Sequence, residues 1–155
     1  MHVDLWSFTL DFYSRPGVEQ ACLALQTHGG NVCALLCGVW LDQNRIPFDA
    51  GRAEEIRQLA QPWHDQVVGP LRALRTQWKT AAVSDEELSA LRERVKVLEL
   101  DAERELLVRL QRLIQDWPER GAQRTGAWLK ALAGDAANLA PDALQVVQHA
   151  GEDIT

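Results

Sequence analysis

The chain has 155 residues, of which 46% are hydrophobic, and its formal net charge is −6. This length and apolar content predict one compact domain and exclude a disordered chain. The negative charge argues against a nucleic-acid-binding protein, because binding to phosphates depends on clustered lysine and arginine. The longest apolar run, residues 32–41, is about half of the roughly 20 residues that a membrane span needs, so we expect no span.

The N-terminus and the cysteines both favour a cytoplasmic protein. No basic segment precedes an apolar one at the N-terminus, so a secretory signal is not predicted. The three cysteines are few and odd in number, which fits reduced thiols better than a disulfide framework.

Two short helices are predicted at the start of the chain. Asp4 is placed to cap the first helix, and residues 14–17 (Ser-Arg-Pro-Gly) end it. Its inward face is marked by Leu5, Phe8 and Phe12. A second helix over residues 18–28 ends at two glycines, which readily adopt the left-handed backbone conformation.

A third helix is predicted over residues 32–43, with Asn31 placed to cap it. Its residues are apolar nearly all round, which is the pattern of a helix covered on most sides. We therefore place this helix at the centre of a helical bundle.

Two prolines interrupt the fourth helical region. Apolar residues recur every three or four positions from Ala53 to Trp78, which predicts one apolar stripe. Pro62 and Pro70 each remove a backbone donor and clash with the preceding turn. The region is therefore predicted to be a kinked helix, or two helices that share a face.

A long helix is predicted over residues 85–116. Residues 84–87 (Ser-Asp-Glu-Glu) form a capping box in which Ser84 is the cap, and neither Gly nor Pro follows until Pro118. At ~1.5 Å per residue such a helix would extend roughly 48 Å, which is longer than the other helices can cover. Its expected inward positions are Leu88, Leu91, Val95, Leu98, Ala102, Leu106, Leu110, Leu113 and Trp117.

A second apolar row on the long helix bears on assembly. Leu100, Leu107 and Ile114 recur every seven residues outside the main stripe. One candidate cover is a pair of glycine-interrupted helices, around Trp128 and over residues 141–147. The other is a second copy of the chain, in which the same patch meets itself across a two-fold axis. We favour a homodimer.

These elements together predict an all-α fold, a single-domain helical bundle with one long helix and a kinked or broken proline-containing helix. Residues 1–150 are expected to form the helical domain and residues 151–155 a loose tail.

The cysteines leave a metal site conceivable. In a hairpin around the two glycines, Cys22 and Cys37 could face each other, with Cys33 one turn from Cys37. Free cysteine is mostly a small buried hydrophobe, however, and none of these spacings is a CxxC. We predict packing residues without a metal, which metal analysis of the purified protein would check.

The histidines and the acidic residues also have structural interpretations. His28 lies at a helix C-terminus, where a histidine interacts favourably with the helix dipole. His64 has no nucleophile near it in the sequence, so a catalytic base is not indicated. The acidic set Glu99, Asp101, Glu103 and Glu105 alternates around the long helix and lacks a metal motif, so it predicts a solvated face. We expect no catalytic residue, no metal site and no cofactor.

A basic row is the most suggestive feature of the sequence. Arg72, Arg75 and Lys79 lie at positions i, i+3 and i+7, beside an apolar stripe that includes Trp78. These four residues predict a docking site for a protein partner or a small anionic ligand. The alternative is a flank that forms salt bridges to the acidic residues 99–105 of the same chain. If the row serves binding, replacing both arginines with alanine leaves stability nearly unchanged.

Several segments together resemble one known family. They are residues 13–18 (YSRPGV), 21–26 (ACLALQ), the stretch from Gly29 to residues 39–41 (VWL), and 67–75 (VVGPLRALR). Over roughly residues 5–110 the chain resembles a family of small, conserved, helical proteobacterial proteins of unknown function. The resemblance implies the helical fold and a bacterial cytoplasm, and it implies no activity or cofactor.

We therefore expect a helical interaction or regulatory module without catalysis, which binds a protein or anionic partner and forms a homodimer. The alternative is a small-molecule-binding protein or enzyme with an apolar pocket under the central helix. In that case Trp40, Trp63 and Trp78 would form the walls, and Arg72 or Arg75 would hold an anionic group. A closed, ligand-sized pocket with converging polar groups would favour this alternative.

Overall fold

The computed structural model describes residues 4–118 and 126–152, and within these ranges all regular secondary structure is helical, as predicted. The first half holds α1 (Leu5–Tyr13), α2 (Val18–Thr27), α3 (Val32–Gln43), α4 (Ala50–Trp63), the π-helix η1 (His64–Val68) and α5 (Gly69–Trp78). A 3-10 turn, η2 (Ala81–Ser84), leads into the long helix α6 (Glu86–Ile114). The C-terminal helices are α7 (Ala127–Ala133), α8 (Ala136–Leu139) and α9 (Pro141–Glu152).

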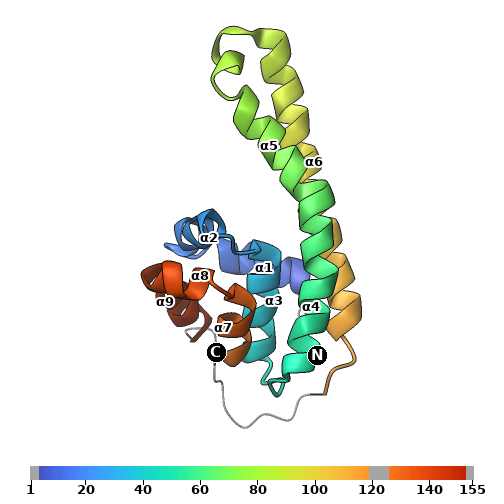
Figure 1. Ribbon diagram of the computed structural model, residues 1–155, viewed down its shortest axis with the longest axis vertical. Coiled ribbons are helices and arrows are strands. Elements are labelled where there is room, and N and C mark those ends of the chain that lie inside the picture. The colour runs from blue at the N-terminus through green and yellow to red at the C-terminus, as the bar shows by residue number, and fades with distance from the viewer. Residues whose placement is uncertain (1–3, 119–125, 153–155) are drawn as a thin grey trace.

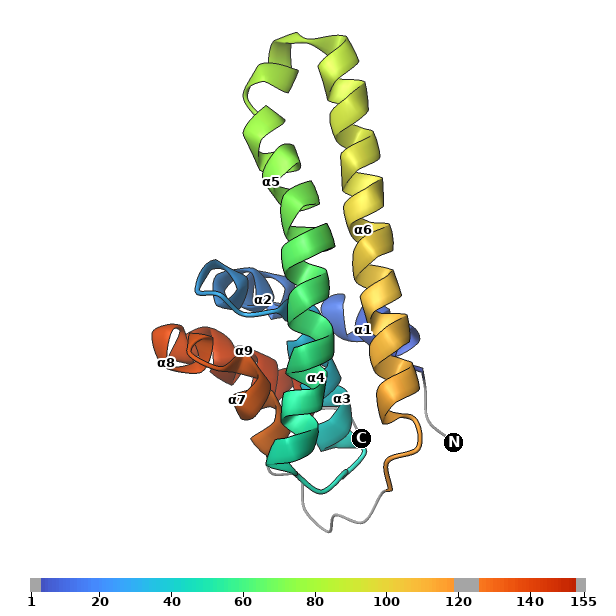
Figure 2. The ribbon, with the colours of Figure 1, turned by 45° about the vertical axis from the view of Figure 1, so that its right-hand side comes forward.

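Two long rods give the molecule its shape. The helices α4, η1 and α5 follow one another as a single rod, and α6 runs antiparallel beside it (Figure 1). The other helices pack around the lower half of these rods, so the upper half projects as a two-helix arm (Figure 2). We call residues 69–101 the arm and the remaining described residues the body.

The third helix is the centre of the body, as the sequence predicts. Every residue from Cys33 to Leu41 is buried, and α3 packs against α1, α2, α4, α6, α7 and α9. The Asn31 side chain caps it by accepting a hydrogen bond from the Ala34 N–H. A Cβ atom added at Gly38 would lie 3.1 Å from the Cα of Leu129, so the absence of a side chain lets α7 approach α3 closely.

The two prolines of the fourth region are joined by a π-helix. In it the Gly69 N–H donates to the carbonyl of His64, five residues back. Pro62 stands in the last turn of α4, and Pro70 stands in the first turn of α5, where a missing N–H is tolerated. The predicted interruption is therefore one extra residue in the helix rather than a sharp break.

The N-cap of the long helix lies one residue after the predicted N-cap. Asp85, and not Ser84, is the N-cap, and its carboxylate accepts a hydrogen bond from the Leu88 N–H. Ser84 belongs to the preceding 3-10 turn. The capping box with Ser84 as its cap was therefore wrong, because the turn that closes the arm uses that serine.

The inward face of α6 was predicted correctly in the body and only in part in the arm. Val95, Ala102, Leu106 and Leu110 are buried as expected. Leu91 and Leu98, also expected to point inward, are 47% and 53% exposed. In the arm α6 has one neighbouring rod, which covers only part of the broad apolar stripe.

The second apolar row of α6 is covered in part by the N-terminal helix. Leu107 and Ile114 are buried in the common core, whereas Leu100 is 54% exposed. Helix α1 packs along this side of α6, where the Gln111 side chain accepts a hydrogen bond from the Leu5 N–H and Arg104 stacks on the Trp6 ring. The expectation that C-terminal helices or a second copy must cover Leu107 and Ile114 overlooked α1.

The C-terminal helices complete the body on the opposite side of α3. Trp128 on α7 is one of the largest fully buried side chains, and its indole donates to the carbonyl of Ile46. Of the expected loose tail, Gly151 and Glu152 belong to α9, and residues 153–155 lie outside the described residues. Among the helices described, none combines the length and the apolar character that crossing a membrane requires.

Candidate functional site

A charged cluster joins the two helices of the arm near its base. Arg72 and Arg75 lie one turn apart on α5 and both reach Glu99 on α6. Arg75 bonds through Nε to Oε2 at 2.5 Å and through Nη2 to Oε1 at 3.1 Å. Arg72 Nε adds a third bond to Glu99 Oε1 at 3.1 Å, and Arg72 Nη2 lies 3.5 Å from an oxygen of Glu103.

The two glutamates of the cluster have different electrostatics. Burial raises the pKa of Glu99, but the hydrogen bonds from Arg75 and Arg72 outweigh it and hold this pKa below its ordinary value. Burial also raises the pKa of Glu103, and its single longer contact to Arg72 does not reverse the effect. Glu99 is therefore a saturated ion-pair partner, whereas Glu103 keeps capacity to accept hydrogen bonds.

The four residues of the predicted docking row do not form one exposed surface. Arg72 and Arg75 make the internal salt bridges that were the alternative interpretation. Lys79 is exposed and forms no ion pair with any residue in the described ranges, and Trp78 is half-buried. The predicted solvated face was wrong for Glu99, which is only 6% exposed because α5 covers it.

A cavity opens beside this cluster, where the arm meets the body. It is lined by residues of α1, α2 and α3 on one side and of α5 and α6 on the other, and its volume is about 440 Å³. We call it the junction cavity. Leu10, Leu23 and Leu100 line it and are each about half exposed, so apolar side chains form part of its exposed rim.

Polar groups also line the junction cavity. Besides the charged cluster, Thr9, Tyr13 and Cys33 line it. The Thr9 hydroxyl is buried and has no hydrogen-bond partner among the described residues. Burial, reinforced by the nearby Cys22, Glu19 and Glu103, raises the pKa of Tyr13 to about 12, so its hydroxyl stays protonated.

Sequence reasoning chose the wrong tryptophans as pocket walls. Trp40 is buried in the core, and Trp63 donates its indole hydrogen to the carbonyl of Ala102. Of the tryptophans in the described ranges, the one that lines the junction cavity is Trp6. Thr9 and Tyr13 were missed as well, although a signal existed: they follow Leu5 at four-residue intervals, so polar groups continue an inward row.

The π-helix places His64 behind the charged cluster. A second, much smaller cavity is lined by Asn31 and His64, and it shares Cys33, Arg72 and Glu103 with the junction cavity. Burial, followed by the charge of Arg72, lowers the pKa of His64, so the imidazole is neutral at pH 7. His28, by contrast, is exposed at the end of α2.

The three cysteines are free and buried. Burial raises the pKa of Cys22 to about 12 and also raises the pKa values of Cys33 and Cys37. Within residues 4–118 and 126–152, no three His, Cys, Asp or Glu side chains are grouped to hold a metal ion.

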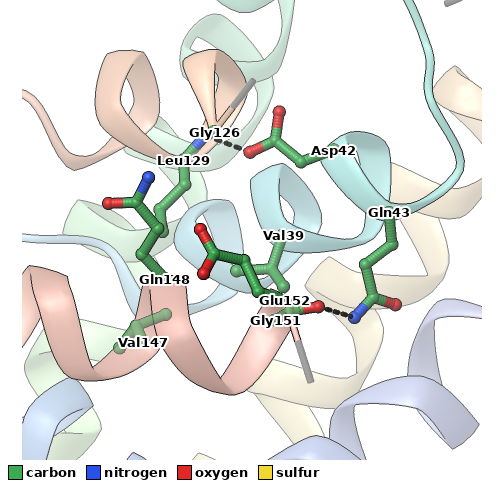
Figure 3. A pocket seen from close by; sticks show the side chains of 9 residues that line it. All are labelled: Val39, Asp42, Gln43, Gly126, Leu129, Val147, Gln148, Gly151 and Glu152. Atoms are coloured by element: carbon green, nitrogen blue, oxygen red, sulfur yellow. Dashed lines mark hydrogen bonds between the residues drawn. The ribbon is translucent and has the colours of Figure 1, made fainter. Parts of the chain in front are cut away.

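A pocket between α3, α7 and α9 is too small for an organic ligand. Its volume is about 40 Å³, and Asp42, Gln43 and Glu152 are among the residues around it (Figure 3). Asp42 accepts hydrogen bonds from the N–H groups of Trp128 and Leu129, which caps α7. Gln43 donates to the carbonyl of Gly151, so the polar groups here hold helices together.

The arm also has an apolar face. Leu74, Leu91 and Leu98 are 38%, 47% and 53% exposed, and we call them the leucine strip. Consecutive helical residues are about 100° apart. Leu74 precedes Arg75 and Leu98 precedes Glu99 by one residue, and the helices are antiparallel, so the strip lies on the side of the arm turned away from the junction cavity.

Comparison with known proteins yields a family match. The profile of a family described as "Protein of unknown function (DUF2390)" matches residues 4–110. The match includes the arm and every residue that lines the junction cavity, whereas α7, α8 and α9 lie beyond it. No curated protein and no solved structure matches the chain.

Proposed function

The chain belongs to the DUF2390 family, which is described as a family of unknown function, and we propose that it is a non-catalytic interaction module whose arm pairs with a second copy of the chain. The observation that carries this proposal is the leucine strip. Two of its leucines are seven residues apart on one face of α6, and both are about half exposed. Half-exposed leucines in register favour a helical partner.

The charge distribution supports a second copy as that partner. The arm, residues 69–101, contains six lysines and arginines and six aspartates and glutamates, so it is neutral. The net charge of −6 therefore falls on the residues outside the arm. Two copies repel each other through their bodies but not through their arms, which makes the arm the surface where they approach at least cost.

The geometry of the arm suits a two-fold contact. In such a contact one patch meets itself, so Leu91 of one copy packs on Leu98 of the other, and the reverse. Two arms placed face to face in this way form a four-helix arrangement, in which each copy covers the side of α6 that its own α5 leaves open.

The proposal replaces the basic row with the leucine strip as the interaction surface. Arg72 and Arg75 already bond to Glu99, so an anionic partner would have to compete with a neighbouring carboxylate. A bacterial cytoplasm as the location also belongs to the proposal. It is supported by the resemblance to proteobacterial proteins and by three cysteines that are free thiols.

Light scattering after size-exclusion chromatography tests the proposal. At micromolar concentration we expect a dimer mass for the natural chain and a monomer mass for the variant Leu91→Glu/Leu98→Glu. Val97→Glu is the matched control, because Val97 is 58% exposed on the same helix but lies about 100° away from Leu98. The control should remain a dimer.

Two results would contradict the proposal. One is a monomer mass for the natural chain throughout the micromolar range. The other is a dimer that survives the two glutamates while circular dichroism shows an unchanged helix content, since the contact would then lie elsewhere.

A further inference from the structure

The junction cavity has the dimensions of a ligand site. Its volume of about 440 Å³ lies within the range of small-molecule pockets in proteins, and the body and the arm each contribute walls. Its apolar part includes Trp6, Leu36 and Leu107, and its polar part includes Tyr13 and the charged cluster. A molecule with an apolar body and a polar head matches this division.

The charges of the cavity decide which head group it accepts. The lining contains two arginines, Arg72 and Arg75, and three carboxylates, those of Glu19, Glu99 and Glu103, so it has an excess of one negative charge. Both arginines already bond to Glu99. An anionic head would therefore find no free cation, whereas a cationic head finds Glu103, whose only ion pair within the described residues is the 3.5 Å contact to Arg72.

The uncharged polar groups of the cavity also fit a hydrogen-bond donor. Thr9 is 9% exposed, and its hydroxyl oxygen is buried and lacks a partner among the residues that the structure describes. A buried hydroxyl without a partner is unfavourable, so a ligand that supplies the missing hydrogen bond gains affinity. Tyr13 presents a second hydroxyl oxygen beside the cavity.

We propose that the junction cavity binds a small amphipathic amine, with its ammonium group at Glu103, Thr9 and Tyr13 and its apolar part between the body and the arm. An ammonium group has three N–H donors, and these three residues offer a carboxylate and two hydroxyl oxygens. The apolar part lies along Trp6, Leu36 and Leu107 and reaches solvent past the exposed leucines of the rim. This site is independent of the proposed pairing, because none of Leu74, Leu91 and Leu98 lines the cavity.

Isothermal titration of the full chain with three probes of equal length tests the proposal. The probes are n-octylammonium, n-octanol and octanoate. We expect one octylammonium to bind per chain about tenfold more tightly than octanol, since a hydrogen-bonded charge contributes about that factor, and octanoate to bind most weakly. Saturable binding of octanoate that is tighter than that of octylammonium would overturn the proposal, and so would the lack of any saturable heat with octylammonium.

Variants locate the binding. Glu103→Gln should abolish the tenfold preference for octylammonium, whereas Glu93→Gln, an exposed carboxylate on the same helix, should keep it. Thr9→Val removes the unpartnered hydroxyl with little change of shape, so it should weaken octylammonium binding without lowering stability. It also serves if Glu103→Gln fails to fold. If the preference for octylammonium over octanol persists in both Glu103→Gln and Thr9→Val, the site is refuted. Octylammonium should still bind to Leu91→Glu/Leu98→Glu, so the result does not depend on the test of pairing.

Discussion

Arg75 holds Glu99 with two nitrogen atoms, Nε at 2.5 Å from Oε2 and Nη2 at 3.1 Å from Oε1. This bidentate contact links α5 to α6 at the level where the arm leaves the body. Arg92 adds to it, since its Nε donates to the backbone carbonyl of Arg75 at 2.8 Å. The basic row therefore holds the arm together, and its contribution to stability is measurable.

Replacing Glu99 with alanine should lower the free energy of unfolding by about 1–3 kcal/mol. The substitution leaves Arg72 and Arg75 without the Glu99 carboxylate, and both arginine side chains are more than two-thirds buried, at 21% and 29% exposed. Urea unfolding followed by circular dichroism measures the loss. The variant Arg72→Ala/Arg75→Ala should also lose stability, whereas the same change in a row of exposed cations would leave stability nearly unchanged.

The control for this prediction is Glu105→Ala on the same helix. Glu105 pairs with Arg109 at 3.2 Å, but both side chains are more than 40% exposed. An exposed pair contributes about 0–1 kcal/mol. If Glu99→Ala and Glu105→Ala lower the free energy of unfolding equally, the buried cluster stabilises the protein no more than an exposed ion pair does.

Asp42 should make stability depend on pH in a defined window. Burial raises the pKa of Asp42 from 3.8 to about 6, against the opposing effect of the Leu129 and Trp128 N–H groups. The unfolded chain releases the Asp42 proton at lower pH than the folded chain does. Protonated Asp42 therefore stabilises the folded state fully below about pH 4, and this stabilisation is lost as the pH rises to about 6. The loss is on the order of 3 kcal/mol.

The difference between the natural chain and Asp42→Asn isolates this effect, because all other groups titrate in both proteins. Urea unfolding between pH 4 and pH 7 should show the natural chain losing stability relative to the variant up to about pH 6 and then holding a constant difference. A difference that stays constant over the whole range would show that Asp42 has an ordinary pKa.

The cysteines should be unreactive in the folded protein. Cys22, Cys33 and Cys37 are buried, and burial raises their pKa values, so little thiolate is present at pH 8. A colorimetric disulfide reagent should react slowly in native buffer and with three thiols per chain in urea. A thiol that reacts in native buffer as fast as free cysteine would contradict the packing shown by the structure.

Trp63→Phe should lower the free energy of unfolding by about 1 kcal/mol. The Trp63 indole donates to the Ala102 carbonyl at 2.9 Å, and the substitution removes this bond while keeping a ring for Arg109 to stack on. Trp6→Phe is the matched control. Trp6 also carries a stacked arginine, Arg104, but its indole donates to no residue in the described ranges. Equal losses for the two variants would assign the effect to ring size.

Features that depend on a few neighbouring residues were predictable from the sequence. Asp4 and Asn31 cap the first and third helices as expected, because a cap needs only its own side chain and an N–H group three residues on. The central position of α3 followed from its apolar residues on all sides. The interruption between Pro62 and Pro70 followed from the missing N–H groups. One such local prediction was wrong by one residue, since the N-cap of α6 is Asp85 and not Ser84.

Features of the candidate sites depend on which helices meet, and the tertiary structure decided them. Glu99 and Leu98 are adjacent in the sequence, yet Glu99 is buried beneath α5 and Leu98 is exposed. The sequence analysis predicted the reverse, with Leu98 inward and Glu99 on a solvated face, because only the position of the neighbouring rod determines which of the two is covered.

The junction cavity shows the same limit. Thr9 and Glu103 line the same space, although 94 residues separate them in the chain. The sequence by itself determined the helices, the caps of α1 and α3, and the all-α fold, because hydrogen bonds within a helix and the spacing of apolar residues are local. The arm, the paired arginines and the cavity depend on which helices pack together. These helices are far apart in the sequence, so burial and charge pairing bring their residues together only in the folded chain.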